Sequence, residues 1–281
     1  MTIRIVTDST CDLPDEVLGE FGIGVVPLYI NFGAASYLDG VELARPDFYE
    51  RLPEADPSPT TAIPGSQAFL DVYDALAHQG ATEIISVHVS SALSGTADAA
   101  KMAARQASVP VTVVDSGSLT LGLGFLVWEA ARMAVEGCTC DEILVRLGAM
   151  RRRTHVFAAL DTLEFLRRSG RMSGVVTRLG GWLRLKPLLK MNDGESTSEK
   201  VRTSEGAIKR LVALLEARLP LERVALVHTH ALERARLLQD RAQHLLAGLP
   251  VLSVDITPVL GTHLGPGAVG FACVESEVRR G

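Results

Sequence analysis

Residues 83–96 read EIISVHVSSALSGT, an apolar run of strand type that passes directly into a turn rich in serine. A nearly continuous apolar run of this length is typical of a parallel strand buried on both faces. The turn ends in Ser94-Gly95, and the pattern that follows is helical, so backbone N–H groups and the helix dipole can converge there on an anion. The stretch therefore predicts an α/β sheet with a turn that holds a carboxylate or phosphate without a charged side chain.

Two other polar turns have a similar character. Pro59-Thr60-Thr61 lies in an expected loop bounded by prolines, and residues 261–267 read GTHLGPG. We expect all three turns to contribute to one anion-holding pocket, with Gly95, Thr96 and Ser116 as additional candidates beside Ser94. The alternative is that Ser94 or Thr96 simply caps the helix, since Ser and Thr are common N-cap residues.

The first half of the chain alternates between strand and helix patterns. Strands are expected at residues 3–7, 24–30, 83–89 and 111–115. Helices are expected to begin near residues 14, 64 or 66, 94 and 119, and a further helix is expected at roughly 141–153. This alternation predicts an α/β domain, residues 1–155, with a parallel sheet and flanking helices. Ligands of such sheets gather at the carboxyl ends of the strands, where Asp8, Ser94 and Ser116 are expected.

The second half has a different pattern. Strand-like runs flank the turn Asn192-Asp193-Gly194, which predicts a hairpin. Further strands are expected at residues 156–160, 224–228, 251–256 and from about 268, with helices at 163–168 and from 204 and 232. We therefore expect a mixed α+β domain over residues 156–281.

Composition excludes several classes of protein. The chain has 281 residues, 47% of them hydrophobic, and a net charge of −5, which argues against a general nucleic-acid binder. No apolar run approaches the roughly 20 residues of a membrane helix. The N-terminus lacks the layout of a secretory signal, which predicts a cytoplasmic protein. The 4 cysteines of the chain form no C-x-x-C pair, so we expect no metal site and no disulfide framework.

Charge is unevenly distributed along the chain. Residues 151–210 contain 14 Lys and Arg against 6 Asp and Glu, a surplus of +8 in a chain of net charge −5. This surplus is typical either of a solvated basic face or of a surface that docks an acidic partner. The second reading leaves open a lipid-responsive regulatory module.

The usual cofactor and nucleotide motifs are absent. Residues 265–270 read GPGAVG and match G-x-G-x-x-G, but only 11 residues follow, too few for the crossover helix of a dinucleotide site. There is no phosphate loop for ATP. Ser94 and His263, with Asp8 or Asp115, still permit a serine-dependent acyl ester hydrolase as a competing hypothesis.

Motifs along nearly the whole chain, taken together, carry a family resemblance. They are Thr7-Asp8-Ser9-Thr10-Cys11-Asp12-Leu13-Pro14, Pro59-Thr60-Thr61, residues 90–96, Asp115-Ser116, Thr162-Leu163-Glu164-Phe165-Leu166, Gly170-Arg171-Met172-Ser173, Lys186-Pro187, Lys200-Val201-Arg202-Thr203, and His263 with Gly265-Pro266-Gly267. In this order they resemble the DegV family of bacterial fatty acid-binding proteins.

The resemblance implies a function and site residues. It implies that a long-chain fatty acid, with no other cofactor, lies between the two domains. The carboxylate would be contacted by Thr61 and Ser94, with His263 nearby, and presented to a separate fatty acid kinase. That kinase would form acyl phosphate for phospholipid synthesis. Arg171 and Arg202 would face the kinase, and transient membrane contact would serve ligand exchange.

Three positions depart from the family pattern. Ala62-Ile63 replace the usual Ser-Gln, Thr120 stands in place of Ser, and Ser169 replaces Gly. Only the first departure is expected to touch the pocket, where it removes polar groups beside Thr61.

Overall fold

The computed structural model describes residues 2–171 and 186–277. Its first sheet has four strands in the order β2-β1-β6-β7, all parallel. The strands are β1 (Ile3–Asp8), β2 (Gly24–Val26), β6 (Glu83–His88) and β7 (Val111–Asp115). The prediction of a parallel sheet is confirmed. Because the strands are parallel, the loops that follow β1, β6 and β7 meet at one edge of the sheet.

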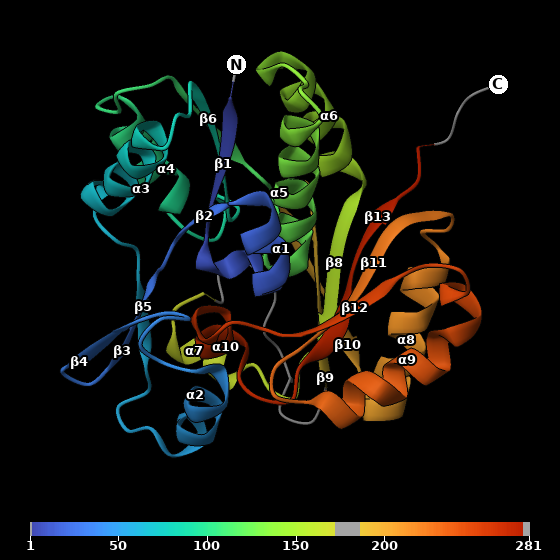
Figure 1. Cartoon of the computed structure of the whole chain (residues 1–281). Coiled ribbons are helices and arrows are strands. Elements are labelled where there is room, and N and C mark those ends of the chain that lie inside the picture. Colours follow the sequence, from blue (N-terminus) through green and yellow to red (C-terminus); the bar gives the residue numbers. More distant parts are fainter. Residues whose placement is uncertain (1, 172–185, 278–281) are drawn as a thin grey trace.

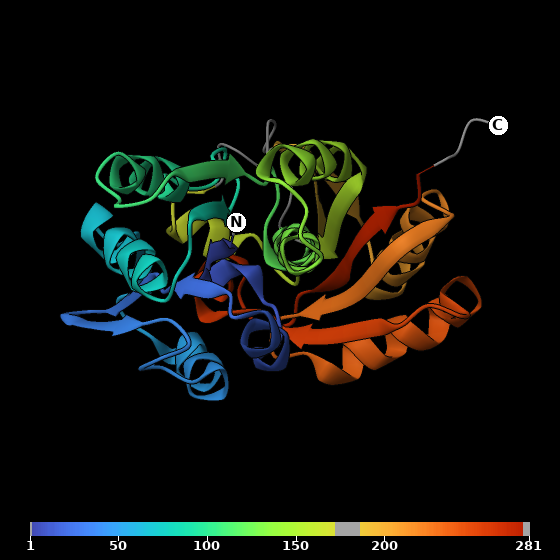
Figure 2. The same ribbon diagram turned by 45° about the horizontal axis from the view of Figure 1, so that its top comes forward.

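Helices cover both faces of this sheet (Figures 1 and 2). On one face, α3 and α4 close a core that includes Phe69 and Tyr73. On the other face lies α5, which packs against both the parallel sheet and the second sheet and is buried along most of its length. The helices are α1 (Asp15–Phe21), α3 (Ser66–His78), α4 (Thr96–Ala104), α5 (Thr120–Val135) and α6 (Cys140–Arg153).

The second sheet has six strands in the order β10-β9-β8-β13-β11-β12. Neighbours are antiparallel except β11 and β12, which confirms the predicted mixed second half. Helices α8 (Ser204–Glu216) and α9 (Leu232–Leu246) cover its outer face. The strands are β8 (Thr154–Ala159), β9 (Lys186–Asn192), β10 (Glu195–Val201), β11 (Leu221–His228), β12 (Val251–Asp255) and β13 (Val269–Glu275).

The predicted hairpin joins β9 to β10. Asn192 pairs with Glu195, which leaves a two-residue turn of Asp193 and Gly194. Their φ angles are 46° and 84°, and both positions of a tight hairpin turn of this kind require positive φ. Asp-Gly is a preferred pair for such a turn, so the local sequence determines the connection.

Residues 27–64 form a small substructure that the sequence pattern did not predict. The expected strand at 24–30 breaks at Pro27 into β2 and β3 (Tyr29–Phe32), which belong to different sheets. β3 pairs with β4 (Ala35–Leu38) and β5 (Thr60–Ala62) in an antiparallel sheet. Two short helical segments, α2 (Arg45–Arg51) and η2 (Leu52–Glu54), follow β4.

Three remaining short helical segments are η1 (Ser9–Cys11), α7 (Glu164–Arg168) and α10 (Pro258–Leu264). α10 packs on the small substructure, where Val259 joins a core with Phe48 and Tyr49. Residues of the second half therefore help to bury residues of the first. No helix in the described part of the chain is long and apolar enough to cross a membrane.

Candidate functional site

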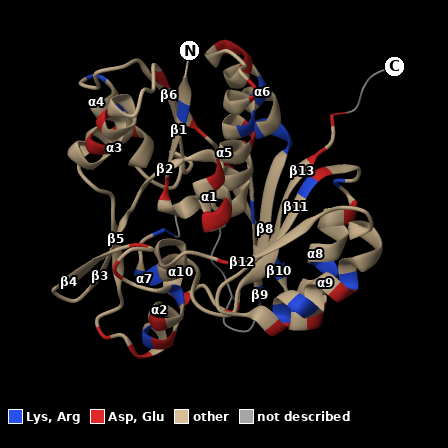
Figure 3. Ribbon diagram, in the orientation of Figure 1, with Lys and Arg blue, Asp and Glu red and all other residues tan. Residues whose placement is uncertain are grey.

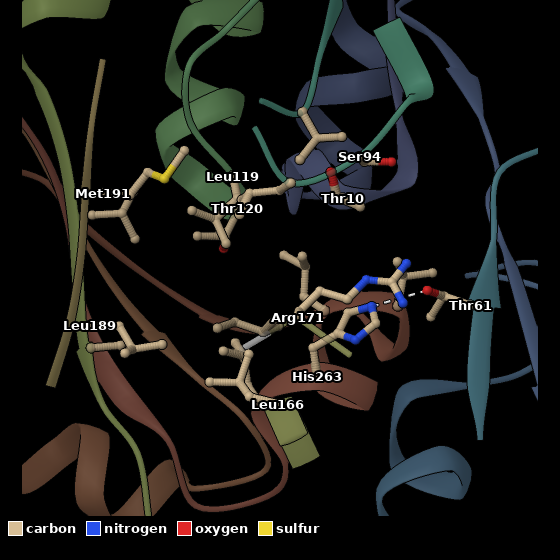
Figure 4. Close-up of a pocket in the computed structure, with 18 of the residues that line it drawn as sticks. Thr10, Thr61, Ser94, Leu119, Thr120, Leu166, Arg171, Leu189, Met191 and His263 are labelled. Atoms are coloured by element: carbon tan, nitrogen blue, oxygen red, sulfur yellow. Dashed lines mark hydrogen bonds between the residues drawn. The ribbon is translucent and has the colours of Figure 1, made fainter. Parts of the chain in front are cut away.

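One cavity of about 1120 Å³, including space open to solvent, lies where the parallel sheet, the small sheet and the inner face of the six-stranded sheet meet (Figure 4). Most of its wall is aliphatic. Apolar side chains come from strands β5, β8, β9 and β11, from the loops that follow β2, β6, β7 and β12, and from α7 and α10. The apolar lining residues are Leu28, Ala62, Ile63, Val89, Leu93, Leu119, Val156, Ala158, Leu160, Leu166, Leu189, Met191, Val227, Ile256, Val259, Leu260 and Leu264.

The three side chains expected at the carboxylate all line this one cavity. Thr61 comes from β5, Ser94 from the loop before α4, and His263 from the last turn of α10. The hydroxyl of Thr61 lies 3.0 Å from Nε2 of His263. Segments about 200 residues apart in sequence are thus joined at a single polar point.

Two of the three expected turns have a different conformation. Thr60 and Thr61 belong to β5, paired with β3, rather than to a loop. Residues 261–264 form the end of α10, which begins at Pro258. Pro258 at the first helical position suits a helix start, and Gly265 with φ of 71° ends the helix, so the turn pattern marks only its C-terminus.

His263 is an uncharged group in this setting. Burial, and then the positive charge of Arg171, lower its pKa from 6.5 to about 4. Its Nδ1 is buried and has no hydrogen-bond partner among the described residues. An unpartnered ring nitrogen is tolerated more easily as a lone pair than as an N–H donor. We therefore assign the proton to Nε2, which in this tautomer donates to the Thr61 hydroxyl and leaves that hydroxyl's own proton free.

Ser94 does not cap helix α4. The N-cap is Gly95, and no side chain caps it. Instead, the hydroxyl of Ser94 lies 2.8 Å from that of Thr96, which is fully buried. In such a pair only one hydroxyl uses its proton, so Thr96 can donate to Ser94 and leave the Ser94 proton free for a ligand.

The additional pocket candidates do not reach the cavity wall. Gly95 and Thr96 lie behind Ser94 and are not lining residues. Ser116 is buried, and its hydroxyl donates to the carbonyl of Ser118 at 3.2 Å. It orders the loop after β7 and is not among the residues that line this cavity.

The two candidate arginines are in different places. Arg171 is exposed and lines the cavity next to His263 (Figure 4), although the resemblance implied only a partner-facing role. Its guanidinium donates to the carbonyl of Ser169 at 2.7 Å. Arg202 is exposed in the turn between β10 and α8 and does not line the cavity.

Two threonines in the wall were not singled out as site residues. The hydroxyl of Thr10 donates to Oδ1 of buried Asp8 at 2.5 Å, and His88 binds the other oxygen of Asp8 at 2.9 Å. Burial alone would raise the pKa of Asp8, but these hydrogen bonds and the charge of His88 lower it, so Asp8 is ionised. Thr120 begins α5 with φ of 47° and lines the cavity, so the expectation that only the Ala62-Ile63 departure touches the pocket is wrong. The sequence signal for each threonine was its position: Thr10 closely follows the buried strand β1, and Thr120 is the first residue of the buried helix α5.

The geometry does not form a catalytic triad. His263 is bonded to Thr61 rather than to Ser94. Asp8 binds His88, and Asp115 accepts the hydroxyl of Ser91. His263, Asp8 and Asp115 therefore each hydrogen-bond a residue outside the triad that the hydrolase hypothesis requires.

Many basic side chains of residues 151–210 form ion pairs, mostly with acids of the same segment that the surplus of +8 already counts. Pairs formed by these residues include Arg151–Asp193, Arg153–Glu222, Arg167–Glu164, Arg168–Glu164, Lys186–Asp161, Lys190–Glu199 and Arg210–Glu199. Figure 3 marks the positions of the acidic and basic residues along the described ribbon. These pairs leave the net surplus of the segment in place, so a docking face for an acidic partner stays a prediction. Among residues 2–171 and 186–277, no group of three or more His, Cys, Asp or Glu side chains could hold a metal ion.

Comparison with known proteins identifies the family to which this chain is similar. The family model described as uncharacterised protein, DegV family, matches residues 2–276. A DegV domain-containing protein of Streptomyces coelicolor is 38% identical over 273 residues, covering 95% of this chain and 96% of that protein.

Solved structures agree with these sequence matches. A fatty acid-binding DegV family protein from Thermus thermophilus has a TM-score of 0.88 at 34% identity and covers 98% of this chain and 100% of its own. The fatty acid-binding protein DegV from Bacillus subtilis has a TM-score of 0.87 at 30% identity and covers 98% and 99%. Because the match extends over both sheets and nearly every residue, the chain belongs to the DegV family.

Proposed function

We propose that this protein binds one long-chain fatty acid and presents its carboxylate to a separate fatty acid kinase, which forms acyl phosphate for phospholipid synthesis. One observation carries the proposal: a cavity with a mostly aliphatic wall is also lined by Thr61, Ser94 and His263, whose side chains are polar but uncharged. The fatty acid-binding relatives named above support the same ligand.

The head group is held by directed hydroxyl protons. In the tautomer argued above, His263 donates to Thr61, so the Thr61 proton is free for a carboxylate oxygen. Ser94, backed by Thr96, supplies a second proton. Hydrogen bonds to a charged group contribute about 1.5–3 kcal/mol each and offset part of the lost hydration of the carboxylate.

The tail provides most of the affinity. About 14 methylene groups at ~0.8 kcal/mol each give roughly 11 kcal/mol of transfer free energy, from which the costs of association are subtracted. Thr10 helps to keep the wall apolar, because its hydroxyl is taken by Asp8. In this proposal residues 1–155 supply the two hydroxyls, and residues 156–281 close over the chain.

The head-group end is also the end that a partner can reach. Ala62, Ile63 and Arg171 line the cavity there and are exposed. A carboxylate held by neutral donors keeps its nucleophilic character, which attack on a phosphoryl group requires. Arg171 would stabilise the phosphate that is being transferred, and exposed Arg202 would contact the kinase. Exposed Ile63 beside the opening would favour brief contact with a membrane during ligand exchange.

Two measurements test the proposal. Native mass spectrometry of the protein purified from cells should show one bound long-chain acid. Adding a bacterial fatty acid kinase and ATP to the loaded protein should then yield acyl phosphate. A protein that carries no lipid and takes up neither oleate nor palmitate contradicts the binding step. A loaded protein that gives no acyl phosphate contradicts the presentation step alone.

A further inference from the structure

The wall opposite the head-group residues is formed by strand β9. In Figure 4, Leu189 and Met191 lie across the cavity from Thr61, on the far side of His263. Met191 pairs with Val156 of β8, and Leu189 pairs with Ala158. Since alternate residues of a strand point to the same face, these four side chains form one continuous surface toward the ligand. A chain that starts at Thr61 and crosses the cavity would reach this surface.

The backbone behind this wall is fixed at the hairpin turn. Gly194 N–H donates to the carbonyl of Gly117 at 2.8 Å, which joins the turn to the loop after β7. Arg151 bonds Asp193 at 2.6 Å and the carbonyl of Asp115 at 2.8 Å. Asn192 donates to the carbonyl of Thr154 at 2.9 Å. The turn is thereby attached to both β8 and the parallel-sheet side.

The side chain next to this turn is well suited to end an acyl chain. Met191 is 4% exposed and belongs to the core cluster that includes Val156. Its thioether is unbranched and has several rotatable bonds, so it adjusts to an irregular neighbour better than a branched residue does. Leu189 is only partly buried. The backbone at the wall is therefore fixed, whereas the end of the Met191 side chain can adapt.

We propose, building on the function proposed above, that Met191 contacts the terminal methyl end of the bound acid and sets the longest chain that the cavity accepts. Nothing else about the site needs to change with chain length, because the carboxylate is held at the opposite end by Thr61 and Ser94.

The test is a competition experiment. The protein is stripped of lipid and offered an equimolar series of saturated acids from dodecanoic to icosanoic acid, and the bound species are counted by native mass spectrometry. Met191→Ala opens space for about two more methylenes, and each buried methylene strengthens binding roughly fourfold. The preferred acid should lengthen by about two carbons, with a roughly 15-fold change in the ratio of the two binding constants. Met191→Phe should shorten the preferred acid.

A matched control comes from the same core. Met150 is fully buried in the same cluster but does not line the cavity. Met150→Ala removes the same atoms and should leave the chain-length profile unchanged.

The possible outcomes distinguish a failure of the proposed role of Met191 from a failure of the proposed fatty acid binding. If both Met191 variants bind fatty acids with the wild-type profile, the role of Met191 is refuted and fatty acid binding stands. If Met150→Ala shifts the profile as much as Met191→Ala, the effect is a general loosening of the core and the proposal is again refuted. If the wild-type protein binds no acid, the proposed function itself fails.

Discussion

Replacing Thr61 by valine tests the head-group chemistry most directly. Valine keeps the shape and strand preference of threonine and removes only the hydroxyl. In the wild-type protein that hydroxyl lies 3.0 Å from His263 Nε2 and is proposed to donate to the carboxylate. The variant therefore loses one hydrogen bond to a charged group and leaves His263 without its partner.

The expected loss follows from these two bonds. A hydrogen bond to a charged group contributes about 1.5–3 kcal/mol, which corresponds to a roughly 10- to 150-fold weaker Kd for the acid. The unpartnered imidazole should also lower the free energy of unfolding by about 1–3 kcal/mol. The tail contribution is unaffected, since no aliphatic lining residue changes.

The assay compares palmitate with hexadecanol by isothermal titration calorimetry. Both have the same tail, but only palmitate has a charged head. Thr61→Val should reduce the preference for palmitate over the alcohol, and Thr60→Val, whose side chain is exposed on the opposite face of β5, should not. Equal weakening of palmitate and alcohol by Thr61→Val, or no weakening, would refute the reasoning.

Three other predictions follow from particular groups. Burial raises the pKa of Asp12 from 3.8 to about 7, so the folded state loses stability as the pH rises through this range. Asp12→Asn can still accept the N–H of Thr257, and its stability relative to wild type, measured by urea unfolding, should increase from pH 5 to pH 8. Parallel curves of unfolding free energy against pH for the two proteins would contradict this. Gly261→Ala would place a methyl carbon in steric conflict with the hydroxyl oxygen of Tyr49, so Tm should fall by several degrees, and an unchanged Tm would show that α10 can shift. Arg171→Gln should raise the pKa of His263 toward its ordinary value in an NMR titration, because burial remains but the positive charge of Arg171 is removed. An unchanged pKa would show that the Arg171 guanidinium does not lie near His263 in solution.

Local sequence was sufficient for most elements of both main sheets. Strand β7 was predicted at its observed bounds, Val111–Asp115, because a short β-branched run is bounded by Pro110 and Ser116. The Asp193-Gly194 turn was predictable for a similar reason: its positive φ angles restrict the choice of residues.

The elements that were missed depend on partners distant in sequence. Thr60 and Thr61 form a strand only because β3 offers an edge for pairing, and proline-rich surroundings suggested a loop. The helix α10 is a single short segment whose apolar residues face Phe48 and Tyr49, more than 200 residues earlier. Seven residues carry too little periodicity to distinguish such a helix from a turn.

The sequence by itself determined the two types of sheet, the edge at which polar loops collect, and the presence of hydroxyl and histidine side chains suited to an uncharged anion site, because strand periodicity and turn chemistry are local properties. Only the tertiary structure decided that His263 lies against Thr61, that Arg171 lines the cavity, and that Leu189 and Met191 form its far wall. These relations depend on how the six-stranded sheet packs against α5 and α10. Aliphatic residues that line a cavity have the same pattern in sequence as those that fill a core, so only their packing distinguishes them.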